Sequence, residues 1–221
     1  PVPGRPAPPS RFPRSVAALP APARLRLAAA SACAVLFALI TWQVLARGPL
    51  LRLDERLDRT VVGHGPKPVT AILTDLGSMP VALPVLALAL AWALWRGARA
   101  SVLAGALTMA AVPALVVPLK IWTDRPGPLT DATGYYPSGH TATAMVAYGT
   151  AALVLLPYAG RRATVPAAAL LTVATAVALV LRGYHWPLDV IASGALCGLL
   201  LLALGAVLRR LAARGTPPGT D

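Results

Sequence analysis

The sequence predicts an all-α protein, a six-transmembrane-helix bundle with both termini cytoplasmic. Hydrophobic residues make up 57% of the 221 residues and charged residues only 13%, whereas a soluble domain carries about 25% charged residues. This apolar excess excludes an ordinary soluble globule and a mostly disordered chain. The two cysteines, Cys33 and Cys197, both lie inside apolar runs, which argues against a disulfide scaffold.

Six apolar runs account for most of the chain, and each is close to the 20 or so residues that cross a bilayer. The first, residues 25–46, contains only Arg26 as a charged residue and is too long for the apolar core of a signal peptide. The second, 79–95, is uncharged, and 69–76 forms a lead-in turn to it. The third, 100–121, has a single charge near its end.

The second half of the chain continues the pattern. The fourth and fifth runs, residues 140–156 and 163–181, contain no lysine, arginine or acid, and the sixth, 187–208, contains only Asp189. Soluble helices of this length rarely lack charge on every face, so buried helices of a soluble protein are the weaker interpretation. We expect one six-span domain over residues 24–210. Residues 1–23 and 211–221 are expected to be disordered tails.

The distribution of charge predicts the orientation of these spans. Six spans place both termini and two short turns on one side, with one acid, Asp221, and twelve of the 20 lysine and arginine residues: Arg5, Arg11, Arg14, Arg24, Arg26, Arg96, Arg99, Arg161, Arg162, Arg209, Arg210 and Arg214. The other side holds the remaining eight basic residues and seven acids. Positive loops mark the cytoplasmic face. The net charge of +12 is therefore explained by topology, and no nucleic-acid partner is needed.

Residues 52–59 (RLDERLDR) form a short charged, amphipathic stretch in the first outer connection. We interpret it as a helix lying on the membrane surface, in preference to a catalytic segment.

Chemically versatile residues gather in the outer connections, in residues 120–128, 135–140 and 182–189. Ser138 is a suitable N-cap for the fourth span, and the amides of the first turn, beginning near Gly139, attract an anion. Lys120, Arg125 and Arg182 add positive charge. Together these residues predict a phosphate-sized anion site at one membrane face.

Two of the three histidines lie in the same segments. Asp189 follows His185 by four residues, with Pro187 in the first turn of the sixth span. One helical turn would let this carboxylate accept a hydrogen bond from one imidazole nitrogen and leave the other as a nucleophile. The alternative is that His185 and Asp189 are two metal ligands, with Asp124 or Asp131 as the candidates for a third.

Each cation also has a structural interpretation. Lys120 at a span end is typical of a snorkelling lysine. Arg125 suits an ordinary loop, and Arg182 suits the C-terminal end of the fifth helix. The third histidine, His64, has no chemical partner nearby in sequence, and we interpret it as a loop residue.

The three segments resemble, in order and type, the motifs of the type 2 phosphatidic acid phosphatase family of integral membrane phosphatases. Lys120 and Arg125-Pro126 are similar to its first motif, Pro137-Ser-Gly-His140 is the complete second motif, and His185 with Asp189 ends the third. The resemblance covers about residues 25–210, including the six-span layout.

The resemblance implies a mechanism without a metal or other cofactor. His185 would attack phosphorus and form a phosphohistidine, Asp189 would orient it, and His140 would protonate the leaving oxygen. The phosphoryl oxygens would be held by Lys120, Arg125, Ser138 and the Gly139 amide. Cations and helix ends would stabilise the transferring group, as a metal ion does elsewhere.

The sequence departs from the family pattern at two points. The Arg-Pro of the first motif is expected seven residues after the lysine, where this chain has Gly127-Pro128, and Arg125 lies two residues earlier. The Ser-Arg of the third motif is replaced by Ala178 and Leu179. We expect Arg125 and Arg182 to substitute for the missing arginines.

The resemblance predicts a membrane lipid phosphatase, and the distribution of charge places its site on the extracytoplasmic face of the plasma membrane. The substrate would be a phosphate monoester or a diphosphate of a lipid, such as phosphatidic acid, phosphatidylglycerol phosphate or undecaprenyl diphosphate. Two alternatives are a phosphotransferase with the same intermediate and a non-catalytic protein that binds phospholipid headgroups. The sequence does not choose the lipid or the oligomeric state.

Overall fold

The computed structural model describes residues 23–214, which form eight helices and no strand. The helices are α1 (Ala23–Leu45), α2 (Pro49–Val61), α3 (Lys67–Asp75), α4 (Met79–Trp95), α5 (Arg99–Thr123), α6 (Gly139–Ala159), α7 (Arg161–Leu181) and α8 (Pro187–Arg214). The predicted all-α class is confirmed over this range. Both expected tails lie largely outside the described residues. At the C-terminal boundary, however, α8 continues four residues beyond 210, because Leu-Ala-Ala at 211–213 are good helix formers.

Five of the helices in the described part of the chain are long and apolar enough to cross a membrane: α1, α5, α6, α7 and α8. The lead-in turn and second span expected from the sequence are α3 and α4, which meet at a 49° bend. Counted as one broken span, this pair brings the number of candidate spans to six. The predicted spans and these helices agree to within three residues at each end, except that α8 continues six residues beyond the predicted end of the sixth span.

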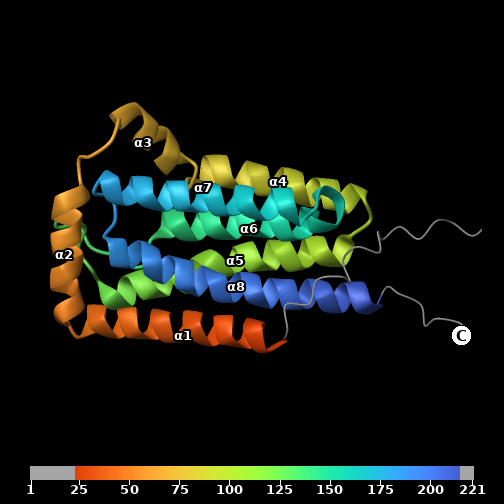
Figure 1. The fold of residues 1–221 in the computed structure, drawn as a ribbon, viewed down its shortest axis with the longest axis horizontal. Helices are drawn as coiled ribbons and strands as arrows, with labels where there is room; N and C mark the ends of the chain where they lie inside the picture. The colour runs from red at the N-terminus through yellow and green to blue at the C-terminus, as the bar shows by residue number, and fades with distance from the viewer. Residues whose placement is uncertain (1–22, 215–221) are drawn as a thin grey trace, which may run out of the picture.

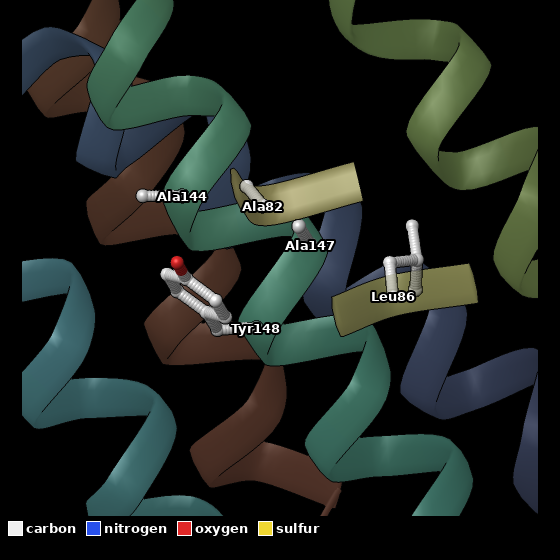
Figure 2. Close-up of a cluster of buried hydrophobic side chains, with 5 residues drawn as sticks. All are labelled: Ala82, Leu86, Ala144, Ala147 and Tyr148. Carbon is white, nitrogen blue, oxygen red and sulfur yellow. The ribbon is translucent and has the colours of Figure 1, made fainter. Parts of the chain in front are cut away.

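Helix α6 occupies the centre of the bundle and packs against α4, α5, α7 and α8. Most of its length is buried, and its sequence is dominated by alanine, glycine and threonine. Figure 2 shows Ala144, Ala147 and Tyr148 of α6 beside Ala82 and Leu86 of α4. Small side chains let helix backbones approach closely, which is how helices associate where lipid removes the hydrophobic driving force.

The two ends of the bundle differ in composition. Ala23 and Arg214 lie at one end, together with the α4–α5 and α6–α7 turns, as Figure 1 shows. Among the described residues, the basic residues of this end are Arg24, Arg26, Arg96, Arg99, Arg161, Arg162, Arg209, Arg210 and Arg214. The opposite end carries α2, α3 and the long connection from Asp124 to Ser138. That connection and the starts of α6 and α8 contain the motif residues.

Helix α2 runs across this opposite end, where it contacts α1, α7 and α8. The sequence assigned it only a place on the membrane surface, but Asp54 and Asp58 are both buried against the bundle. Leu53 and Leu57 are exposed instead. In lipid an apolar face can point outward, so the acidic face of this helix is free to turn inward toward the site.

The α3–α4 join positions the start of α6. Gly77 is buried there, and a Cβ added to it would lie 2.8 Å from the carbonyl oxygen of His140 and 2.6 Å from Cγ2 of Thr175. The backbone carbonyl cannot rotate away as a side chain can, so the broken span and the first turn of α6 are in contact only because residue 77 has no side chain.

We expect Gly77→Ala to destabilise the protein by about 1–3 kcal/mol, the usual range for overpacking. The matched control is Gly194→Ala in α8, where an added Cβ meets no atom within 4 Å; a helical Gly→Ala change there should leave stability equal or higher. The measurement is Tm in detergent. Equal Tm values for the two variants would contradict this packing.

Candidate active site

A cleft of about 310 Å³ opens at the end of the bundle that carries α2 and α3. Its lining residues are Leu129, Thr130, Tyr135, His140, Leu179, Gly183, Tyr184 and His185. The two histidines predicted to be catalytic therefore face one cavity although 45 residues separate them in sequence. His185 is buried, whereas His140 is exposed at the start of α6.

Asp189 lies beside His185, as their spacing predicts. The distance from His185 Nδ1 to Asp189 Oδ2 is 3.3 Å, and the Trp186 amide donates to the same oxygen at 3.2 Å. Asp189 is completely buried in the first turn of α8, where the helix dipole favours a negative charge. With Nδ1 facing the carboxylate, Nε2 is the ring nitrogen left for chemistry, so His185 is arranged as a nucleophile or a base.

The residues predicted to bind an anion lie at and beside the start of α6. Ser138 is the N-cap, and its side chain accepts a hydrogen bond from the Thr141 amide at 3.3 Å. Lys120 lies alongside: a Cβ on Gly139 would be 3.8 Å from Lys120 Cε. Lys120 Nζ donates to the Gly134 carbonyl at 2.5 Å. A cation thus flanks the first turn of a helix, which is where backbone amides attract anions.

Arg125 is buried beneath this site and is shared by two carboxylates. Its Nη1 donates to Asp189 Oδ1 at 2.5 Å, and its Nη2 donates to Asp54 Oδ2 at 2.6 Å. The other oxygen of Asp54 accepts from the Leu188 amide at 2.9 Å. The Trp186 ring covers the guanidinium, with its centroid 5.3 Å from the Arg125 Cζ. Asp54 is the site residue that the sequence analysis missed.

Asp58 lies one turn beyond Asp54 on the same buried face of α2. Burial raises the pKa of Asp58 to about 6, and the negative charges of Asp54 and Asp189 add to the effect. Its Oδ1 has no hydrogen-bond partner among the described residues. Burial also raises the pKa of Asp54, against the opposing effect of Arg125. The two carboxyl groups differ because Asp54 is fully hydrogen-bonded and Asp58 is not.

Tyr135 and Tyr136 hold the loop before α6 in place through contacts with other segments. Tyr136 is fully buried, and its hydroxyl lies 2.7 Å from Oγ1 of Thr41 in α1. The ring of Tyr135 lies against His185, with centroids 5.5 Å apart. The same ring packs on Gly127, where an added Cβ would lie 2.7 Å from Tyr135 Cζ. An arginine at 127, which the family motif leads one to expect, would have to displace this tyrosine.

The second altered motif position also lies at the cleft. Leu179, which stands where the family pattern has arginine, is buried and lines the cavity. Arg182 is the C-cap of α7; its Nη2 donates to the Tyr184 hydroxyl at 2.8 Å and its Nη1 to the Lys67 carbonyl at 3.3 Å. Both Arg125 and Arg182 therefore have protein partners, and their substitution for the missing arginines stays a prediction.

Among the described residues, no third ligand lies beside His185 and Asp189 to complete a metal site. Within residues 23–214, no three histidine, cysteine or acidic side chains are grouped so as to hold a metal ion. Asp124 and Asp131, the candidates for a third ligand, are exposed in the connection between α5 and α6. His64 lies in the exposed loop between α2 and α3.

Comparison with known proteins agrees with this arrangement. A sequence profile of the PAP2 superfamily matches residues 101–212, which contain the motif residues. The fold matches that of a transmembrane PAP2 type phosphatidylglycerolphosphate phosphatase from Bacillus subtilis with a TM-score of 0.70 and 20% sequence identity. The match covers 82% of this chain and 96% of that one. A comparison with curated protein sequences finds no match.

We expect Asp58→Asn to stabilise the protein at neutral pH. Because the folded-state pKa of Asp58 lies above its ordinary value of 3.8, ionisation disfavours the folded state as pH rises from about 4 to about 6. Asparagine removes that charge, so Tm in detergent should rise by about 3 °C at pH 7.5. The gain should vanish near pH 4. A gain independent of pH, or a loss at pH 7.5, would contradict a buried, unpaired Asp58.

Proposed function

The chain belongs to the PAP2 superfamily, and from that premise we propose that it is a membrane lipid phosphatase acting through a phosphohistidine intermediate. The observation that carries the proposal is the contact between His185 and the buried Asp189, together with the cleft that His185 and His140 both line. Binding a headgroup requires cations and amides, but it does not require a nucleophile oriented by a buried carboxylate. This feature favours catalysis over a purely binding role.

The substrate is a phosphate monoester or a diphosphate of a lipid. The cleft lies at the end of an apolar bundle, so the tail of a lipid can remain in the bilayer while its headgroup reaches the histidines. The solved structure of similar fold is that of a phosphatidylglycerolphosphate phosphatase. Phosphatidic acid, phosphatidylglycerol phosphate and an isoprenyl diphosphate such as undecaprenyl diphosphate are the candidates.

In the first step, Nε2 of His185 attacks phosphorus, and the bond between phosphorus and the leaving oxygen breaks. His140 donates a proton to that oxygen, while Asp189 holds the Nδ1–H and balances the positive imidazole. In the second step, water attacks the phosphohistidine and gives a proton to His140. The N–P bond then breaks, its electron pair returns to Nε2, and phosphate leaves.

The transferring phosphoryl group is held by groups at the start of α6. Lys120, Ser138 and the Gly139 amide bind its oxygens, where they stabilise charge that spreads over them in the transition state. Arg182 contributes positive charge beside the cleft, whereas both Nη atoms of Arg125 are occupied by Asp189 and Asp54 beneath it. No metal or other cofactor takes part.

The protein is oriented with its arginine-rich end in the cytoplasm, following the positive-inside rule. With the α3–α4 pair counted as one span, the described residues contain six spans, an even number, so both termini lie in the cytoplasm. The cleft then opens on the extracytoplasmic face of the plasma membrane.

The test is phosphate release by the purified protein in detergent, with EDTA, from a panel of the candidate lipids. Wild type should release phosphate, and His185→Ala should lower kcat by at least about 10³-fold because the nucleophile is gone. His64→Ala, an exposed loop histidine, is the matched control and should match wild type. Phosphate release by His185→Ala at close to the wild-type rate, or loss of wild-type activity when EDTA is added, would contradict the mechanism. Transfer to an added alcohol in preference to water would identify a phosphotransferase.

Removal of Arg182 tests its predicted role at the phosphoryl group. Arg182→Ala should lower kcat/KM by about 10-fold, the effect of losing one charge-assisted interaction. Arg59→Ala removes a cation that is exposed on α2 and should change kcat/KM less than two-fold, within the small worth of surface ion pairs. Equal kinetics for both variants would remove Arg182 from the binding set.

A further inference from the structure

We propose that Asp54 of α2 is a positioning residue for the catalytic pair: it holds one side of Arg125, so that Asp189 keeps an oxygen for His185. The inference rests on the proposed function and adds to it a residue outside the three motifs. Asp54 touches neither histidine and acts through Arg125.

The geometry around Arg125 shows how the sharing works. An arginine fork facing a single carboxylate commonly makes two parallel hydrogen bonds, one to each oxygen. Here the two Nη atoms bind different carboxylates: Nη1 donates a hydrogen bond to Asp189 and Nη2 donates one to Asp54. Asp189 Oδ1 therefore receives the arginine, and Oδ2 faces His185 Nδ1 and the Trp186 amide. A two-bond Arg125–Asp189 pair would compete for the oxygen that orients the nucleophile.

Charge leads to the same conclusion. Arg125, Asp54 and Asp189 are all buried, so their interactions are screened little by water. One guanidinium cannot neutralise two carboxylates, and the group of three retains a negative charge beside His185. That charge stabilises the positive imidazole formed when His185 bonds to phosphorus. Without Asp54, Arg125 would cancel the charge of Asp189.

Asp54 is itself held in place. Its Oδ1 accepts from the Leu188 amide in the first turn of α8, so the same carboxylate ties α2 to the helix that carries Asp189. Both partners are far from Asp54 in sequence, at 71 residues for Arg125 and 134 for Leu188. Such a residue is placed by tertiary structure, and no local pattern requires an acid here.

Asp54→Asn is the decisive variant, because asparagine keeps the size and an acceptor for the Leu188 amide while it removes the charge that holds Nη2. We expect kcat to fall about 100-fold, as a displaced catalytic group does, and KM for the lipid to stay within two-fold. Asp58→Asn makes the same chemical change one turn away and should leave kcat within two-fold. A rise in KM with unchanged kcat, or equal losses in the two variants, would overturn the proposal.

A double-mutant cycle separates positioning from a general structural role. If Asp54 acts through Arg125, Asp54→Asn should lower kcat far less in an Arg125→Lys background than in wild type. A lysine has a single Nζ and cannot bind Asp189 and Asp54 through two separate nitrogen atoms as Arg125 does. The same factor in both backgrounds would show that Asp54 acts independently of Arg125.

A spectroscopic measurement separates this proposal from the proposed function. In protein labelled with ¹⁵N-histidine, the Nδ1–H of His185, identified by its loss in His185→Ala, should resonate downfield because it faces a carboxylate. Asp54→Asn should move that resonance upfield, and Asp58→Asn should not. This readout requires no turnover, so an unmoved resonance would overturn the positioning role even if the protein were inactive on every lipid tested.

Discussion

The buried sharing of one guanidinium by two carboxylates is the constraint on which the rest of the site depends. Removing three charged groups from water is unfavourable unless each is paired and hydrogen-bonded. Arg125, Asp54 and Asp189 meet that condition only when α2, the connection after α5 and the start of α8 are all in place. The charge group thus makes the orientation of His185 a consequence of how three separate segments dock.

Helix α6 supplies the other half of the site by a different kind of interaction. Its alanine, glycine and threonine residues pack closely against four neighbouring helices. The buried core thereby sets the position of its first turn, where Ser138 is the N-cap and His140 enters the cleft. The two departures from the family pattern change the lining of the cleft: Gly127 leaves space for the Tyr135 ring, and Leu179 lines the cavity with an apolar side chain. The cleft is consequently more apolar and aromatic than two arginines would make it.

Local features were predictable from the sequence, and long-range ones were not. The helices followed from apolar run length, the cap at Ser138 from residue type and position, and the His185–Asp189 contact from a spacing of four on a helix. Asp54 was not predicted as a site residue because its partners lie far away in the sequence. In addition, the acidic side chains of a charged amphipathic segment usually face water. A usable signal was present: Asp54 and Asp58 are four apart, on a different face from Leu53 and Leu57, in a protein whose apolar faces meet lipid.

The central claim is that His185, oriented by Asp189, carries the phosphoryl group. The most direct measurement is to quench the protein during turnover of a ³²P-labelled lipid phosphate and map the labelled peptide by mass spectrometry. We predict an acid-labile, alkali-stable phosphoryl group on His185, absent from His185→Ala and present in His64→Ala. Label on any other residue, or none under conditions where phosphate is being released, would contradict the phosphohistidine mechanism.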